Sequence, residues 1–129
     1  MQDFRRLHVW HEAVDTAVSI YRATENLPAA EEYGLRAQMR AAAVSVSSNI
    51  AEGCGRPGRG DMARFLGIAI GSVCELQSQL LIAQHLGILA DAEMEDPLRR
   101  VDDLRRGLIA LHGRVKTRRT AFADDSGAS

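Results

Sequence analysis

Apolar side chains recur at intervals of three and four residues in four separate stretches of this chain, which is the spacing of one face of an α-helix. The stretches cover residues 7–24, 35–53, 62–88 and 98–115. The face predicted for the first stretch consists of Leu7, Trp10, Val14, Ala17, Tyr21 and Thr24. No stretch alternates polar and apolar residues for long enough to predict a strand. Because the connections between the stretches are short, consecutive helices are expected to lie antiparallel. The sequence therefore predicts an all-α fold, an antiparallel up-down-up-down four-helix bundle.

Glycine and aspartate mark the ends of the predicted helices. Gly53 is placed to take the left-handed conformation just past the second helix, and Asp61 is placed to cap the third. For the fourth helix we favour Asp96 as the cap, with Pro97 as the first helical residue. A start at Asp91 would put Pro97 in the second turn, where a backbone hydrogen bond would be lost.

Length and composition indicate one soluble domain. The 129 residues divide into a predicted bundle domain, 1–116, and a C-terminal tail, 117–129, that loses the helical periodicity and is predicted to be disordered. The longest weakly polar stretch, residues 65–74, is shorter than the about 20 residues that a membrane span needs. The first residues lack the pattern of a signal peptide, and the two cysteines are expected to be reduced. We therefore predict a cytoplasmic protein without a membrane partner.

The third helix is apolar around most of its circumference, which is unusual for a surface helix of a monomer. Gly67 and Gly71 lie inside it, and each costs about 1 kcal/mol relative to alanine. A compensating gain is expected, most simply a close helix–helix approach. Either this helix is central in the bundle, or another subunit covers its outer stripe. We favour the second interpretation and predict a homo-oligomer.

The connection between the second and third helices is rich in glycine and arginine. Residues 53–58 match the pattern G-x-G-x-x-G, but a dinucleotide-binding loop needs a strand before its glycines, and here they follow a helix. The segment is predicted to be an interhelix turn. A lesser hypothesis is an anion or nucleic-acid contact through Arg56, Arg59 and Arg64, beside the N-terminus of the third helix.

The fourth helix holds a second set of arginines. Arg99, Arg106 and Arg114 are candidate contacts for RNA or DNA, because a ring of subunits would concentrate such patches. Asp102 and Asp103 fall between them at helical spacing, so a salt-bridged, solvated face is the default interpretation. The net charge of −1 provides no overall field that attracts nucleic acid, so binding would need a local patch.

Several polar side chains fall on or beside the core stripes of the second and third helices. They are Arg40, Asn49, Glu52, Ser72, Glu75 and Gln79. Charged groups at such positions need partners. We predict that this set forms an interhelix polar network that fixes the register of the helices.

No catalytic or metal-binding pattern stands out. A carboxylate-bridged di-iron centre needs two Glu-x-x-His pairs, and none of the four histidines has a glutamate three positions before it. We predict no metal, no cofactor and no catalytic residue. The alternative is a ribonuclease of the higher eukaryote and prokaryote nucleotide-binding type, in which His112 acts as general acid–base and Arg106 holds phosphate. Gly107 stands where those enzymes usually carry a polar residue.

Three blocks of the sequence resemble a known family. They are LHVWHEAVDTAVSIYRAT (7–24), EEYGLRAQMRAAAVSVSSNIAEGCGR (31–56) and RFLGIAIGSVCELQSQLLIAQHLGIL (64–89). These blocks are similar to the bacterial four-helix bundle proteins that are also described as 23S ribosomal RNA intervening-sequence proteins. The patterns SNIAEG-x-GR and RFL-x-IA-x-GS-x-x-EL-x-x-QL carry the similarity. Ser47 departs from the family, which usually has proline at this position.

The resemblance implies a left-handed four-helix bundle that assembles into a ring, with the homopentamer as the characteristic state. The accessory variability determinant of diversity-generating retroelements is similar, and it binds nucleic acid and a reverse transcriptase through its pentameric surface. We therefore predict a non-enzymatic, pentameric scaffold for RNA, DNA or a nucleic-acid enzyme. The alternative outside catalysis is a purely structural or protein-binding oligomer.

Overall fold

The computed structural model describes residues 2–31 and 34–127, with side chains through Thr117, and these residues form helices and turns but no strand. The long helices are α1 (His8–Ala23), α2 (Leu35–Gly55), α3 (Arg59–His85) and α4 (Asp91–Gly127). Two short 3-10 helices, η1 (Phe4–Arg6) and η2 (Ala29–Glu31), precede α1 and α2. The predicted all-α fold is confirmed.

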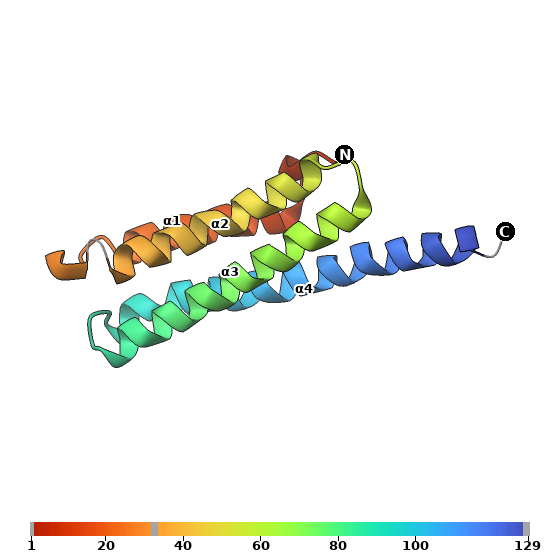
Figure 1. Ribbon diagram of the computed structural model, residues 1–129. Coiled ribbons are helices and arrows are strands. Elements are labelled where there is room, and N and C mark those ends of the chain that lie inside the picture. The colour runs from red at the N-terminus through yellow and green to blue at the C-terminus, as the bar shows by residue number, and fades with distance from the viewer. Residues whose placement is uncertain (1, 32–33, 128–129) are drawn as a thin grey trace.

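Each helix of the bundle packs against two others, because α1 and α3 each contact both α2 and α4. Within the described part of the chain α1 and α3 do not contact each other, so they lie diagonally across the bundle. Consecutive helices run in opposite directions, and the α1–α2 and α3–α4 connections lie at the same end (Figure 1). The α2–α3 turn and the N-terminus lie at the other end (Figure 1). This arrangement is consistent with an up-down-up-down bundle.

The core forms where the apolar stripes of the four helices meet. Its largest fully buried side chains are Ile20, Met39, Ile50, Leu66, Leu76, Leu80, Met94, Leu104 and Leu108. In α1 the predicted stripe was displaced by one residue: Val9, Ala13 and Ile20 are buried, whereas Tyr21 is 44% exposed. The displacement arises because α1 packs against two neighbours, so a face between the two contacts becomes the buried one.

Gly53 does not take the left-handed conformation that the sequence predicted. It lies inside α2, and Gly87 is the one described residue with positive φ, at 72°. A Cβ atom on Gly53 would lie 3.1 Å from Cβ of Phe65. This glycine therefore permits a close approach between α2 and α3 instead of ending a helix.

The starts of α3 and α4 also differ from the prediction. α3 begins at Arg59, with Gly58 as its N-cap, so Asp61 lies in the first turn. There its carboxylate still interacts favourably with the helix dipole. α4 begins at Asp91, and Pro97 lies inside the helix. Met94 explains the early start of α4, because its side chain is buried in the core, and burying it requires the extra turn.

The last part of α4 extends beyond the other three helices (Figure 1). Its helical conformation continues to Gly127, through most of the segment predicted as a disordered tail. The division of the chain into a bundle domain, 1–116, and a tail, 117–129, stays a prediction.

Candidate functional site

The α2–α3 turn carries the first group of predicted contacts, and the ring of Phe65 organises two of them. Cζ of Arg56 lies 5.3 Å from the centroid of this ring, and Cζ of Arg64 lies 4.6 Å from it. Arg56 also pairs with Glu52 through a 2.7 Å contact between Nη2 and Oε1. Arg59 is exposed and makes no hydrogen bond or ion pair with any described side chain. Arg59 and Arg64 therefore carry charge that no described carboxylate neutralises.

A groove of about 420 Å³ lies beside this turn, and Cys54, Arg56 and Arg59 contribute to its lining. Burial raises the pKa of the Cys54 thiol, with the nearby carboxylate of Asp3 adding to the effect. The group therefore stays a protonated thiol at neutral pH, which is a poor nucleophile. Its arrangement is that of a buried apolar side chain, not of a reactive cysteine.

On α4, two of the three predicted contact arginines form ion pairs within the helix. Nη2 of Arg99 lies 2.8 Å from Oδ1 of Asp96, and Nη2 of Arg106 lies 2.7 Å from Oδ2 of Asp102. Arg114 is exposed and has no partner among the described side chains. The salt-bridged interpretation thus describes Arg99 and Arg106, and the nucleic-acid role of all three stays a prediction.

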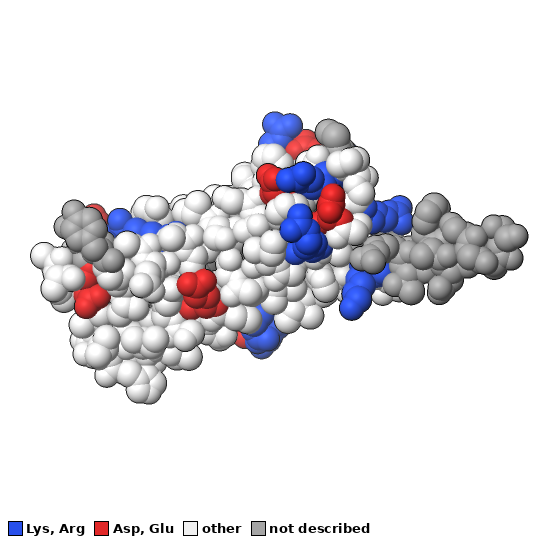
Figure 2. Space-filling view, in the orientation of Figure 1, with Lys and Arg blue, Asp and Glu red and all other residues white. Residues whose placement is uncertain are grey.

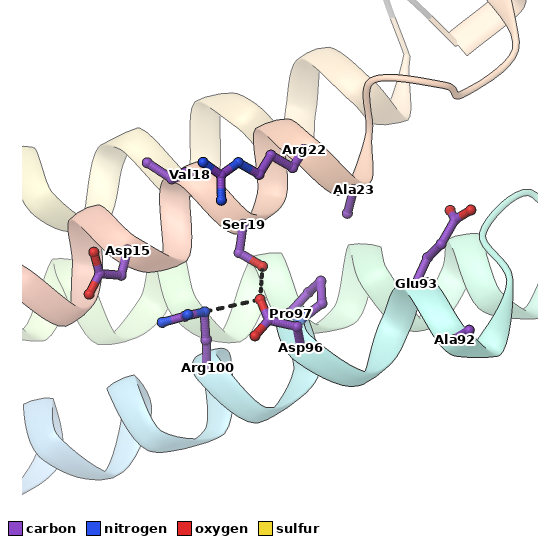
Figure 3. Close-up of a pocket in the computed structure, with 10 residues that line it drawn as sticks. All are labelled: Asp15, Val18, Ser19, Arg22, Ala23, Ala92, Glu93, Asp96, Pro97 and Arg100. Carbon is purple, nitrogen blue, oxygen red and sulfur yellow. Dashed lines mark hydrogen bonds and ion pairs between the residues drawn. The ribbon is translucent and has the colours of Figure 1, made fainter.

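Asp96 is the centre of a polar cluster between α1 and α4 that sequence reasoning missed (Figure 3). Its Oδ2 accepts a hydrogen bond of 2.6 Å from Oγ of Ser19 and one of 3.0 Å from Nε of Arg100. These bonds, with that of Arg99, lower the pKa of Asp96 from 3.8 to about 2, and Ser19 makes the largest contribution. They lie in a groove of about 490 Å³. The cluster ties α1 to α4, and its central carboxylate is satisfied within the chain.

The six residues of the predicted polar network do not form one network. Ser72 bonds to Ser45 through a 3.0 Å contact between their hydroxyl oxygens, and Nδ2 of Asn49 donates to the same Ser45 hydroxyl at 3.0 Å. This small cluster links α2 to α3, and Ser45 is the member that the sequence did not single out for it. The signal was available, because Ser45 precedes Asn49 by one helical turn.

The other four members lie apart from this cluster. Glu52 pairs with Arg56 at the surface. Glu75 accepts a 3.2 Å hydrogen bond from Nε2 of Gln79, whose own Oε1 is buried without a partner among the described atoms. Arg40 instead bonds to the end of α1. The set therefore acts at three or more separate places on α2 and α3.

Arg106 and His112, the residues of the alternative ribonuclease hypothesis, are not brought together on α4. Residues six apart on a helix point in directions about 120° apart around its axis and are separated by about 9 Å along it. Arg106 is held by Asp102, while His112 lies against α3, with Nε2 3.9 Å from the position of a Cβ on Gly67. Within one subunit, the two side chains do not converge on a common substrate.

The solvent-facing side of α3 exposes several large apolar side chains, and we refer to it as the α3 outer face. Its exposed apolar and small residues are Gly67, Ile68, Gly71, Cys74, Ser78, Leu81, Ile82 and, just past the helix, Leu86, and the exposed polar residues Glu75 and His85 lie among them. Ile68 is 43% exposed, Ile82 48% and Leu86 61%. Figure 2 shows that charged side chains are sparse over the middle of this side and gather near the α2–α3 turn. Contiguous exposed apolar surface is a common feature of interaction sites, so this face is a candidate site.

The two glycines of the α3 outer face do not make the close helix–helix approach that the sequence predicted, at least not within the subunit. A Cβ on Gly71 would meet no atom within 4 Å, and one on Gly67 would meet only His112 at 3.9 Å. Their cost to helix stability is therefore not repaid by contacts between the described residues of one chain.

By length and composition, α3 also satisfies the requirements of a membrane-crossing helix, with a mean hydropathy of 1.5 and 33% of its most apolar window buried. The prediction of no membrane span considered only the shorter stretch 65–74. One such helix is weak support for a span, because a core helix of a soluble bundle meets the same requirements. α3 packs against both α2 and α4, and we interpret it as a bundle helix.

Among the described residues there is no group of three or more histidine, cysteine, aspartate or glutamate side chains that could hold a metal ion. The described part of the chain is thus a helical bundle with one bare apolar helix face and arginine groups at its ends. A family model described as 23S rRNA-intervening sequence protein matches residues 5–110. The chain belongs to this family, as the resemblance of its sequence blocks predicted.

A search among solved structures agrees on the fold. The chain is similar to a protein of unknown function from the S23 ribosomal protein family of Bacteroides thetaiotaomicron, with a TM-score of 0.73 and 20% sequence identity. The similarity covers 81% of this chain and 95% of that one. No curated protein matches the chain.

Proposed function

We infer that the protein is a non-enzymatic homo-oligomer whose subunits associate through the α3 outer face, and that the assembly is a scaffold for nucleic acid or a nucleoprotein partner. The observation that supports association of the copies is the α3 outer face itself. Isoleucine and leucine side chains lie exposed there beside Gly71, which has open space above it, and Gly67, where a Cβ would meet only His112 at 3.9 Å. A helix from a second copy could approach closely over glycine and bury the flanking aliphatic side chains.

The resemblance to ring-forming bundles favours a pentamer for this assembly. The scaffold role rests on arginines that no described carboxylate neutralises, namely Arg59, Arg64 and Arg114. Each copy in a ring would repeat these charges, so the attraction for a polyanion would exceed that of one subunit. A catalytic role has less support, because Arg106 and His112 diverge on α4.

The mass of the full chain in solution, measured by sedimentation equilibrium, tests the assembly. We expect an oligomer for the wild type and a monomer for Ile82→Asp, because an unpaired carboxylate buried in an apolar interface is strongly unfavourable. Val18→Asp is the matched control: Val18 is 42% exposed, on α1, diagonally opposite. This variant should keep the wild-type mass. A monomeric wild type, or equal effects of both variants, would contradict the proposal.

The scaffold role is tested by anisotropy of labelled RNA and DNA over a range of salt concentrations. We expect binding at low salt that weakens as salt rises, because phosphate contacts release counterions. If the protein is an oligomer that binds neither RNA nor DNA at low salt, the nucleic-acid role is overturned. The alternative of a structural or protein-binding oligomer would then be favoured.

A further inference from the structure

A groove of about 440 Å³ between the end of α1 and the start of α2 concentrates positive charge outside the arginine groups already described. Its lining residues are Tyr21, Arg22, Glu25, Arg36 and Arg40, and we refer to it as the α1–α2 groove. Three guanidinium groups face a single carboxylate among these residues. The groove therefore has an excess of positive charge, in contrast to α4, where Arg99 and Arg106 each pair with an aspartate.

Arg36 and Arg40 are held in place by neutral acceptors at the C-terminus of α1. Arg36 donates from Nε to the carbonyl oxygen of Thr24 at 2.9 Å and from Nη2 to that of Leu27 at 2.6 Å. Arg40 donates from Nε to Oγ1 of Thr24 at 3.0 Å and from Nη2 to the carbonyl oxygen of Tyr21 at 3.1 Å. These bonds fix both side chains without cancelling their charge. Each guanidinium has five N–H donors, so each keeps donors for a ligand.

Arg22 and Tyr21 complete the groove from α1. Arg22 is exposed, and its guanidinium makes no hydrogen bond or ion pair with any described side chain. The ring of Tyr21 is stacked with Arg40, whose Cζ lies 4.4 Å from the ring centroid, yet the residue is 44% exposed. An exposed ring among fixed cations is the combination that binds single-stranded nucleic acid, with bases stacked on the ring and phosphates on the arginines.

The α1–α2 groove does not overlap the α3 outer face, because α1 lies diagonally across the bundle from α3. Each copy in a ring also uses a second, different surface to contact its other neighbour, and the proposal requires that this second surface lies away from the groove. The groove lies at the end of the bundle opposite to the α2–α3 turn (Figure 1). It is therefore a separate site from the predicted contacts Arg56, Arg59 and Arg64.

We propose that the α1–α2 groove binds single-stranded nucleic acid, with backbone phosphates on Arg22, Arg36 and Arg40 and a base on Tyr21. The proposal rests on the scaffold role and deepens it, because it names the strand state of the ligand and the surface that contacts it. Arg36 and Arg40 also cap α1, so replacing them would lower the stability of the fold as well as remove a ligand contact. Arg22 and Tyr21 are therefore the residues to change.

The first experiment compares Arg22→Ala with Arg6→Ala in the full chain, using anisotropy of a labelled single-stranded oligonucleotide. Both arginines are exposed and their side chains lack a described hydrogen-bond or ion-pair partner, so each change removes one charge without breaking a contact. We expect Arg22→Ala to reduce the slope of log affinity against log salt by about 0.7, which corresponds to one lost phosphate contact on a single strand. Arg6→Ala should leave this slope close to that of the wild type, because Arg6 lies in η1 and outside every proposed contact surface.

The outcomes separate the two proposals. If the wild type binds no oligonucleotide at low salt, both the scaffold role and the proposed binding at the α1–α2 groove are overturned. If the wild type binds and Arg22→Ala changes the slope no more than Arg6→Ala does, the scaffold role stands and the groove is overturned. Equal binding of double-stranded and single-stranded oligonucleotides would also overturn the groove, because a paired base cannot stack on Tyr21.

The second experiment compares Tyr21→Phe with Tyr21→Leu. Phenylalanine keeps the ring, whereas leucine keeps apolar bulk without it. We expect wild-type affinity for Tyr21→Phe and a loss of about fivefold or more for Tyr21→Leu, the lower limit of a base–aromatic stack. The proposal would be overturned if the two variants bind the oligonucleotide with equal affinity and millimolar inorganic phosphate displaces it. Those results would show that the groove is a site for free phosphate. Circular dichroism confirms that each variant is folded.

Discussion

The inner and outer faces of α3 are both apolar, yet they differ in what they contact. On the inner face Leu66, Leu76 and Leu80 are fully buried against the other helices, while on the outer face Ile68 and Ile82 remain 43% and 48% exposed. Hydrophobicity therefore identifies the side chains that a helix tends to bury. The positions of the neighbouring helices decide which of those side chains are buried within one chain. The outer face is where burial is still to be gained.

The glycines of α2 and α3 show the same contrast. Gly53 on α2 lies against the inner side of the α2–α3 contact, and a Cβ there would crowd Phe65. Gly71 on α3 faces open space. Contacts within the described residues explain the first glycine, whereas they do not explain the second, for which we propose a contact with another copy.

The largest effect should come from truncating the inner face. We expect Leu76→Ala to lower the free energy of unfolding by about 2–5 kcal/mol, through lost burial and the cavity left behind. Both changes are made in an Ile68→Asp chain, which we expect to be monomeric because it places a carboxylate on the α3 outer face. In this chain Ile82→Ala should change the free energy of unfolding by about 0.5 kcal/mol or less, as at other surface positions. Denaturant unfolding measures both. Similar losses would mean that both faces of α3 are packed within the subunit.

Alanine at the two glycines should have effects of opposite sign on the subunit. Gly53→Ala places Cβ 3.1 Å from Cβ of Phe65 and 3.4 Å from the carbonyl oxygen of Met62. Overpacking of this kind costs about 1–3 kcal/mol, of which the helix propensity of alanine returns about 1 kcal/mol. Gly71→Ala should stabilise the monomeric subunit by about 1 kcal/mol.

The assembly should respond to Gly71→Ala in the other direction, because a methyl group would hold the partner helix away. We expect a lower sedimentation mass at equal concentration in the otherwise wild-type chain. A Gly71→Ala protein with full mass and higher stability would argue that this glycine does not lie in the subunit interface.

A smaller effect than that of Leu76→Ala is expected at Asp96, whose described partners all lie within the same chain. The pKa of Asp96 is lowered to about 2 from 3.8, so its contribution to stability is complete above about pH 4 and is lost as the pH falls towards 2. Because the side chain is 49% exposed, we expect Asp96→Asn to cost only about 1 kcal/mol at pH 7. The difference from wild type should shrink between pH 4 and pH 2 in thermal unfolding. A constant difference across that range would assign the effect to packing.

The candidate sites were less predictable than the fold. Spacing alone predicted that Asp102 would pair with arginine along α4, because both partners lie on one helix. The Ser19–Asp96 bond joins residues 77 positions apart, and no periodicity within either helix could indicate it. The α1–α2 groove was missed for a related reason: the apolar stripe predicted for α1 included Tyr21 as a core residue, which concealed an exposed ring.

The sequence by itself determined the helices, because apolar spacing and backbone preferences act within a few residues of the chain. It determined the family through blocks in the first three helices and the turn that follows the second. Tertiary structure alone decided which face of α3 is bare, that Gly53 is a contact and not a helix end, and that Pro97 lies inside α4. Those outcomes depend on contacts between helices, since each helix is stabilised mainly by the surfaces against which it packs.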